Sequence, residues 1–340
     1  HICTIATSGG ASSKVILLAG GYDADNEDLT TPASGDSKGR AVYAVDASTG
    51  TLSTVLNFNH SNYSNINYCI VDLTSFDYNS DHLEDTIYAP SLGGNLFVFK
   101  DRDKDGSWEK RWLFKARDGG TATTLLKFLY APDVVLESFG DYVYIGTGDR
   151  THPSETTTVN RFYAIKNKWT TPWTDGTSTL TEASLDDVTL YNYGPSSTYT
   201  FNNGWFIQLN EHSGEKVVST PIVFNEIVFF TTYTPDSTSE TDECATQGLG
   251  GGRLYALKYK TGEAALNFDE TNDSGDEEVI AKSDRSIYLG GGIPSQPTLI
   301  VTSKGTKLII GTQGAGGDAG IRTFDIPGGA GAVPYYWKQN

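Results

Sequence analysis

The sequence predicts an all-β protein of the β-propeller class, with long insertions between its strands. A strand that ends in glycine recurs along the chain, and an aromatic strand follows it each time after a turn or an insertion. Short apolar strands introduced by proline also recur. The composition is rich in β and turn formers, with 37 Gly, 19 Tyr and 15 Phe. Long periodic apolar helices are hard to find, which favours repeated antiparallel blades.

The repeated units follow one another in order along the chain. The glycine-ended and aromatic strands pair as VILLAGGYD (15–23) with AVYAVDASTG (41–50), TIYAPSLGG (86–94) with NLFVFKDRD (95–103), DYVYIGTGD (141–149) with RFYAIKNK (161–168), EIVFFTTYT (226–234) with RLYALKYKTGEA (253–264), and KLIIGTQGAG (307–316) with IRTFDIPGG (321–329). The segment GWFIQLNEHSGEKV (204–217) forms the second half of a sixth unit, and we expect a seventh within 166–203. Six to seven blades follow, and we favour a modified seven-bladed propeller.

Prolines and turns punctuate these units. Pro132, Pro221 and Pro297 each precede a short apolar strand, where the missing N–H leaves no ladder bond unmade. The turns at Asp46–Gly50 and Lys260–Gly262 close hairpins through the tolerance of glycine for positive φ. We expect helices of no more than two turns.

Length and charge restrict the classes of function. The 340 residues suit one large all-β domain over 1–340, and no apolar run is long enough for a membrane span. The net charge of −17 argues against binding to nucleic acid or anionic lipid. The chain begins at His1 and contains no Met, so we expect a processed or excised piece of a longer protein.

Two acidic loops carry the spacing of calcium ligands. Calcium takes six to eight oxygen ligands, which side chains at positions 1, 3, 5 and 9 and a carbonyl at position 7 of a loop can supply. The first-choice site is Asp77, Asn79, Asp81, the Leu83 carbonyl and Asp85, and the second candidate is Asp101, Asp103, Asp105, the Ser107 carbonyl and Glu109. Asx hydrogen bonds are the alternative explanation of the first loop, and a D-G hairpin is that of the second.

The two loops differ at the sixth position, where a sharp turn favours glycine. The second loop has Gly106, whereas the first has His82, which must adopt a left-handed conformation. The three aspartates of the second loop repel one another unless a cation compensates. Arg102, Lys104 and Lys110 are interleaved with them and could supply part of that charge.

The other chemically suggestive residues have simpler interpretations. The cluster YDADNED (22–28) is interpreted as a solvated insertion loop. Asp149 and Arg150, beside His152, are interpreted as an ion pair at a blade turn rather than an acid–base set. No HExxH, G-x-S-x-G or P-loop motif occurs. Cys3, Cys69 and Cys244 leave the disulfide pairing open.

Several stretches together resemble a known family. AGGYD with AVYAVDASTG, YAPDVVLESFGDYVYIGTGDRTHPSETTTVNRFYAIK, GEKVVSTPIVFNEIVFFTTYTP, LYALKYKTGEA, and GGGIPSQPTLIV with GTQG look like the C-terminal propeller domain of PilY/PilC-type type IV pilus biogenesis factors and tip adhesins. The resemblance runs from about residue 15 to Trp337, and its most specific part is the GTGDRTHP and NRFYAI run.

The resemblance implies a non-enzymatic, secreted or surface-exposed protein at the pilus tip or outer membrane. Its partners would be minor pilin subunits and host or abiotic surfaces, and it would support pilus assembly, retraction control and adhesion. The family's regulatory calcium loop maps onto Asp77, Asn79, Asp81 and Asp85, with His82 where the family usually has glycine. The family's large N-terminal adhesive region is absent from this chain.

Two other function classes remain as alternatives. A pyrroloquinoline-quinone-type dehydrogenase would share the hairpin style of this quinoprotein-like propeller, but its central cofactor-binding set cannot be assembled from this sequence. A purely structural or interaction scaffold would need neither calcium nor a cofactor.

Overall fold

The structure is a computed structural model that describes residues 1–28, 35–116, 125–169, 179–192, 199–235, 250–273, 278–303, 305–313 and 319–327. Two compact units make up the chain, and each is described by itself. The N-terminal unit contains His1–Pro153, Asn160–Asp187 and Phe201–Gln208. The C-terminal unit contains Ser154–Val159, Val188–Thr200 and Leu209–Asn340. A single domain over 1–340 stays a prediction.

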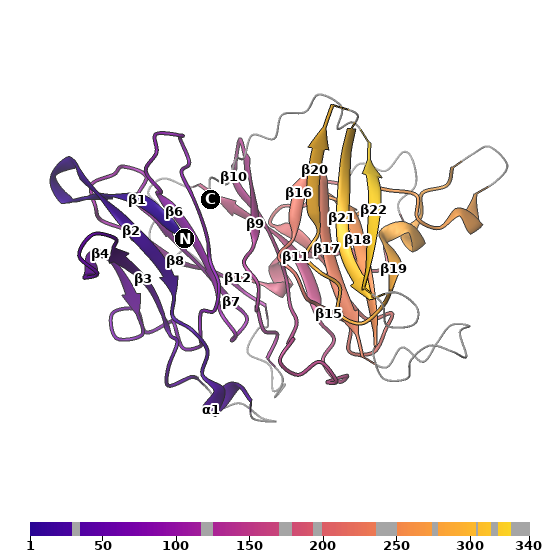
Figure 1. The fold of residues 1–340 in the computed structure, drawn as a ribbon, viewed down its shortest axis with the longest axis horizontal. Coiled ribbons are helices and arrows are strands. Elements are labelled where there is room, and N and C mark those ends of the chain that lie inside the picture. The colour runs from indigo at the N-terminus through magenta and orange to yellow at the C-terminus, as the bar shows by residue number, and fades with distance from the viewer. Residues whose placement is uncertain are drawn as a thin grey trace. The chain divides into compact units, whose positions relative to one another are not determined.

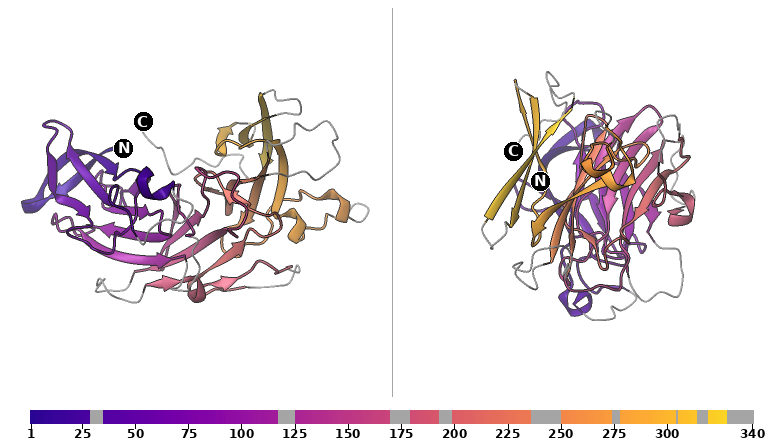
Figure 2. Two further views of the ribbon diagram at one scale, coloured as in Figure 1. Left: turned by 90° about the horizontal axis from the view of Figure 1, so that it is seen from below. Right: turned by 90° about the vertical axis from the view of Figure 1, so that its right-hand side faces the viewer.

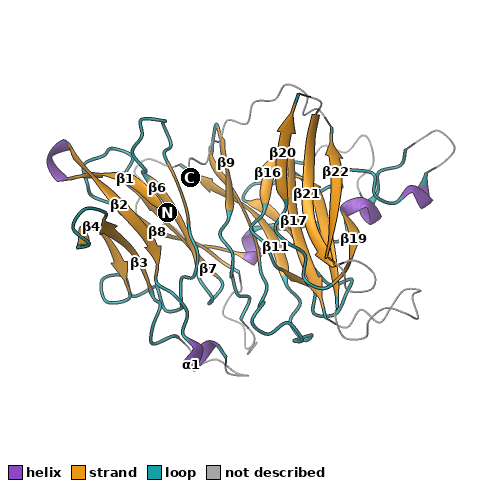
Figure 3. Ribbon diagram, in the orientation of Figure 1, coloured by secondary structure: helices purple, strands orange, loops and turns teal. Residues whose placement is uncertain are grey.

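The predicted all-β class is confirmed, and the sheets are curled and antiparallel for most of their length (Figure 1). The described helices are single turns, which Figure 3 shows between the strands. They are α1 (Ala24–Glu27) and the 3-10 helices Ser8–Gly10, Glu182–Ser184, Glu270–Asn272 and Lys282–Arg285. In the described ranges no helix is long and apolar enough to cross a membrane.

Three sheets form the N-terminal unit. The first sheet has the order β1 (Ile2–Thr7), β2 (Ala11–Ala19), β3 (Ala41–Asp46), β4 (Leu52–Asn59). The second has the order β12 (Leu180–Thr181), β8 (Glu109–Lys115), β7 (Asn95–Lys100), β6 (Thr86–Pro90), β5 (Thr74–Phe76). The third has the order β13 (Asp186–Asp187), β14 (Gly204–Gln208), β11 (Arg161–Lys168), β10 (Gly140–Gly146), β9 (Asp133–Glu137).

The second sheet is buried on both faces. Ile87 and Phe97 belong to the hydrophobic core shared with the first sheet, whereas Tyr88 and Val98 belong to the core shared with the third. Alternate residues of a strand point to opposite faces, so β6 and β7 contribute to two cores at once. The uninterrupted apolar sequences of these strands follow from that placement, because the second sheet shares one core with each of the other two sheets of the N-terminal unit. Figure 2 shows these sheets in two further views.

One larger sheet forms most of the C-terminal unit. Its main path has the order β15 (Lys216–Val217), β17 (Ile227–Thr234), β18 (Gly251–Lys258), β19 (Ser286–Gly291), β21 (Gly305–Gln313), β20 (Thr298–Thr302). Two more strands lie off that path, where β16 (Ile222–Phe224) pairs with β17 and β22 (Ala319–Ile326) pairs with β21. Two predicted units, 226–264 and 307–329, are therefore joined in one sheet.

The predicted positions of the prolines before strands and of the glycines in turns are confirmed. Pro132, Pro221 and Pro297 each stand one residue before β9, β16 and β20. Gly50 and Gly262 have φ of 72° and 71° at the two predicted turns. Each glycine thus adopts the left-handed conformation that closes its hairpin.

The unit expected within 166–203 does not form a sheet of its own in the described part of that segment. The segment instead supplies β12 and β13, which extend the second and third sheets by parallel pairing. Leu185 belongs to the hydrophobic core of the second and third sheets, and Leu180 packs against that core, so the described apolar side chains of the segment complete existing sheets. Among the cysteines, Cys3 and Cys69 are buried free thiols, and Cys244 lies outside the described residues.

Gly204 provides a test of how tightly the strands of the third sheet approach one another. Its φ is 118°, and a Cβ there would lie 1.9 Å from the carbonyl oxygen of Ala164 on β11. We expect Gly204→Ala to lower the free energy of unfolding by about 2 kcal/mol or more, because both backbone strain and a backbone clash are introduced.

Gly50→Ala is the matched control, since Gly50 also has a positive φ but no neighbour within 4 Å of an added Cβ. Chemical denaturation of both variants measures the difference. Equal losses of stability would contradict the close approach of β14 to β11.

Candidate metal centre

The two acidic loops lie side by side at one end of the second sheet. Strand β6 pairs with β7 so that Thr86 faces Lys100. The first loop (residues 77–85) therefore enters the sheet where the second loop (residues 101–109) leaves it. The Asp101 amide donates to the Asp85 carbonyl oxygen at 2.8 Å, which joins the loops directly.

Backbone amides of the first loop donate hydrogen bonds to carboxylates of the same loop. Asp77 Oδ1 accepts from the Asn79 amide at 3.1 Å, and Asp77 Oδ2 accepts from the His82 amide at 2.6 Å. Asp81 Oδ1 accepts from the Leu83 amide at 3.1 Å. His82 has φ of 71°, so the left-handed conformation expected at the sixth position is confirmed.

Asp85 closes the first loop and has one carboxylate oxygen without a donor. Oδ1 accepts from the Tyr78 amide at 3.3 Å and from Thr86 Oγ1 at 2.7 Å. Oδ2 is buried and has no hydrogen-bond partner among the described residues. Burial raises the pKa of Asp85 to about 6. A cation at this oxygen would supply the partner that the protein does not.

The second loop brings three carboxylates together. One oxygen from each of Asp101, Asp103 and Asp105 lies within 4.8 Å of the other two. The Gly106 amide donates to Asp101 Oδ2 at 3.1 Å, whereas Asp101 Oδ1 is buried and has no hydrogen-bond partner among the described residues. Burial, together with the neighbouring carboxyl groups of Asp103 and Asp105, raises the pKa of Asp101 to about 6.

The interleaved cations are directed away from this aspartate triad (Asp101, Asp103 and Asp105). The Arg102 guanidinium lies 3.3 Å from Asp141 Oδ2. The Lys110 ammonium lies 4.7 Å from the centre of the Tyr63 ring. Lys104 extends into the first loop, where it pairs with Asp81. The three positive charges that could have neutralised the triad are thus engaged elsewhere.

Lys104 is inserted among the predicted ligands of the first loop. Its Nζ forms an ion pair with Asp81 Oδ2. The Asn79 amide is satisfied when its oxygen accepts from Lys104 Nζ at 2.8 Å and its nitrogen donates to Asp77 Oδ1 at 3.0 Å. The lysine of the second loop therefore supplies one positive charge to the first loop.

Glu109 stands apart from the rest of the second candidate site. Its Oε2 lies 2.8 Å from Lys100 Nζ, across the β7–β8 pair. The side-chain ligands that the structure groups together in this loop are therefore the aspartate triad. The buried oxygens of Asp85 and Asp101 that lack donors fit a hard cation, because carboxylate oxygen is the ligand that calcium prefers.

The interpretation of residues 22–28 as a solvated loop is wrong for its key residues. Asp23 and Glu27, at the start and end of α1, are fully buried. Glu27 Oε2 lies 2.6 Å from the buried Nζ of Lys127, which also lies 2.9 Å from Asp149 Oδ2. No sequence pattern indicates this partner, because Lys127 is 100 residues from Glu27.

Asp149 is therefore paired differently from the sequence-based interpretation. Its Oδ2 contacts Lys127 and, at 2.9 Å, His152 Nδ1, whereas Arg150 donates to the Tyr130 hydroxyl at 3.3 Å. Although burial opposes the charged form, hydrogen bonds from Thr151 and Lys127 lower the pKa of Asp149 to about 2. Burial raises the pKa of Glu27 to about 7 despite the same lysine.

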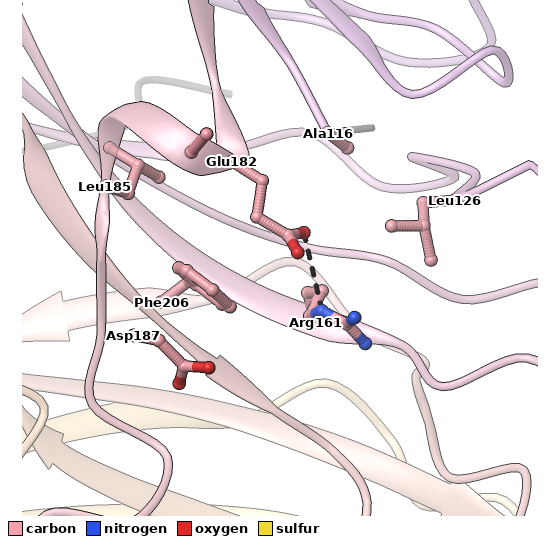
Figure 4. A pocket seen from close by; sticks show the side chains of 8 residues that line it. Ala116, Leu126, Arg161, Glu182, Leu185, Asp187 and Phe206 are labelled. Atoms are coloured by element: carbon pink, nitrogen blue, oxygen red, sulfur yellow. Dashed lines mark ion pairs between the residues drawn. The ribbon is translucent and has the colours of Figure 1, made fainter. Parts of the chain in front are cut away.

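A separate cavity of about 480 Å³ lies in the N-terminal unit, bounded by residues of β11, β14 and the segment between β12 and β13 (Figure 4). Glu182 Oε2 lies 3.4 Å from Arg161 Nε and also accepts from the Tyr163 hydroxyl at 2.6 Å. The central charges of this cavity thus neutralise each other, in contrast to those of the aspartate triad.

Comparison with known proteins confirms the resemblance that the sequence indicated. No protein-family model matches the chain. A curated protein of Xylella fastidiosa, named a type IV pilus biogenesis factor PilY1 homolog, is 26% identical over 252 residues. The match covers 66% of this chain and 16% of that protein.

The fold has a solved counterpart. The crystal structure of the Pseudomonas aeruginosa PilY1 C-terminal domain superposes with a TM-score of 0.64 at 18% identity, covering 96% of this chain and 72% of that one. This likeness shows a shared fold. A Fusarium graminearum GH93 α-L-arabinofuranosidase reaches a TM-score of only 0.35 at 10% identity, which carries no functional argument.

The buried Glu27 generates a pH prediction. Its folded pKa of about 7 lies above the unfolded value of about 4.5, so between these pH values the folded state holds a proton that the unfolded state has released. The resulting stabilisation of the folded state is complete below about pH 4.5. That contribution is lost as the pH rises toward and through 7, and its slope is at most about 1.4 kcal/mol per pH unit.

We expect Glu27→Gln to make the free energy of unfolding fall less steeply between pH 4.5 and 7 than in the wild type. Urea denaturation across this range measures the slope. Asp25→Asn is the matched control, because Asp25 lies on the same helix but is exposed. A Glu27→Gln slope equal to that of the wild type would contradict the buried placement of this carboxyl group.

Proposed function

We propose that this chain is the propeller part of a non-enzymatic, calcium-binding, type IV pilus-associated protein. The relative in the curated comparison carries the name of a pilus biogenesis factor, and the fold is that of a PilY1 C-terminal domain. Because the match spans 16% of that relative, association of the whole protein with pili is an inference from similarity.

The aspartate triad is the single observation that carries the calcium part of the proposal. Three carboxylates converge beside a buried oxygen that lacks a donor, and the neighbouring cations point elsewhere. Like charges at such distances are unfavourable without a counterion, and a hard divalent cation with oxygen ligands satisfies this set.

The residues that would hold calcium come from both loops. In the second loop the ligands are the aspartate triad, with the Ser107 carbonyl and Glu109 completing the set if Glu109 leaves Lys100. In the first loop they are Asp77, Asn79, Asp81, the Leu83 carbonyl and Asp85. Calcium would supply the positive charge that holds these oxygens together and so would fix the end of the β6–β7 pair.

The consequence for function is a surface whose shape depends on calcium. An ion that binds only the folded state stabilises it by RT ln(1 + [L]/Kd), about 2.7 kcal/mol at 100-fold saturation. The loops would then present one fixed conformation to minor pilin subunits at the pilus tip and to host or abiotic surfaces. Such a protein acts outside the cell. In this proposal, residues 1–340 form a single propeller domain.

Calcium should raise the thermal unfolding temperature of the wild type by a few degrees relative to the protein in chelator. Asp103→Ala should lose most of the heat of calcium binding in calorimetry, because it removes one of the three carboxylates of the triad. Asp81→Ala should lose the part that belongs to the first loop.

Asp186→Ala is the control for these variants, since Asp186 is an exposed carboxylate in the same unit and lies outside both loops. Loss of binding equal to that of Asp103→Ala would show a diffuse charge effect. Absence of any calcium-dependent change in the wild type would contradict the calcium part of the proposal.

The pilus part has a separate test in the organism that makes the protein. Deleting the gene for the whole protein should reduce the number of surface pili counted by electron microscopy, and the intact gene should restore it. An unchanged number of pili, with unchanged retraction and adhesion, would contradict the assignment to pili.

A further inference from the structure

Lys104 has an unusual position for a residue of a cation-binding loop. It lies between two members of the aspartate triad in sequence, yet its ammonium group forms an ion pair with Asp81 and contacts Asn79 in the first loop. Two of the first loop's predicted ligands are therefore engaged by a positive charge that belongs to the second loop.

The backbone conformation of Lys104 explains why its side chain extends toward the first loop. Lys104 has φ of 58°, a left-handed conformation that is uncommon outside glycine. Its amide donates to the Asp101 carbonyl oxygen at 3.2 Å, so the turn of the second loop defines where the side chain starts. The adjacent first loop lies within reach of the four-carbon stem, and the ammonium is the partner that its acidic groups select.

The same position makes Lys104 a competitor of calcium. An ammonium and a divalent cation cannot share the oxygens of Asn79 and Asp81, because the two charges repel each other and each ligand oxygen can face only one of them. We propose that Lys104 is a tethered cation that fills the first loop of the calcium-free protein, so that calcium occupies the second loop first and enters the first loop only by displacing Lys104.

The order of filling follows from where the cations are. The two cations of the second loop both pair outside the aspartate triad, Arg102 with Asp141 and Lys104 with Asp81, and the neighbouring Lys110 packs on Tyr63. The first loop, in contrast, must exchange one cation for another. The inference rests on the proposed calcium binding and adds to it an affinity-determining residue. The Lys104 side chain is one quarter exposed, so water can receive the displaced ammonium.

The decisive experiment isolates the first loop by calorimetry of the full chain in an Asp103→Ala background. We expect the Asp103→Ala/Lys104→Gln variant to bind calcium about tenfold more tightly than Asp103→Ala alone, because the competing charge is gone. Asp103→Ala/Lys110→Gln is the matched control, since it removes one nearby positive charge that does not contact the first loop. We expect its affinity to change by less than about twofold.

Chemical labelling of the wild type gives a second readout. Acetylation of lysines by an amine-reactive ester, followed by mass spectrometry, should modify Lys104 faster in saturating calcium than in chelator, because the ammonium is released to water. The labelling of Lys110 should not change with calcium. Circular dichroism of each variant checks that the fold is retained.

The ways in which these experiments can fail are distinguishable. The role of Lys104 alone would be overturned if Lys104→Gln leaves calcium binding in the Asp103→Ala background unchanged, or if Lys110→Gln strengthens it equally. Equal labelling of Lys104 in calcium and in chelator, in a protein that binds calcium, would also overturn the role of Lys104. Absence of calcium binding by the wild type and by every variant would overturn the proposed function, and this inference with it.

Discussion

The pairing of β6 with β7 is the constraint on which the rest of the N-terminal unit depends. Both strands carry apolar side chains on both faces, so a slip of one residue in their register would exchange the contents of two cores. The register that fills these cores also places Thr86 opposite Lys100 and hence sets the two acidic loops against each other. The geometry of the candidate metal centre is thus a by-product of hydrophobic packing in the sheet beside it.

Electrostatic compensation over long sequence distances is the second theme of the structure. The chain has a net charge of −17, and in the described structure single lysines pair with carboxylates that range from exposed to fully buried. Lys104 forms an ion pair with Asp81, and Lys127 forms ion pairs with both Glu27 and Asp149. Each of these contacts links different segments of the chain. A buried carboxylate without a partner lowers the stability of the folded state. The position of a lysine such as Lys127 therefore restricts the conformations that the loops around it can adopt.

Features that depend on local chemistry could be predicted from the sequence. Strand positions follow from alternation and aromatic content, the prolines mark strand starts, and His82 has the backbone conformation that its place in the loop requires. The direction of a side chain such as Lys104 depends on which loop lies beside it, which only strand pairing decides. The burial of Glu27 likewise has no local signal in the sequence, because the partner that permits it lies 100 residues away. The short polar strands β12 and β13 have no pattern of their own, since they form only as edges of existing sheets.

The ion triad of Glu27, Lys127 and Asp149 has a consequence for anyone who shortens this protein. The segment that contains α1 is an insertion between β2 and β3, the kind of excursion that is commonly trimmed to obtain a smaller scaffold. Removing it would leave the Lys127 ammonium with one carboxylate partner, Asp149, in place of two. A minimal version of the domain therefore needs a second change, such as an apolar residue at position 127, made together with the deletion.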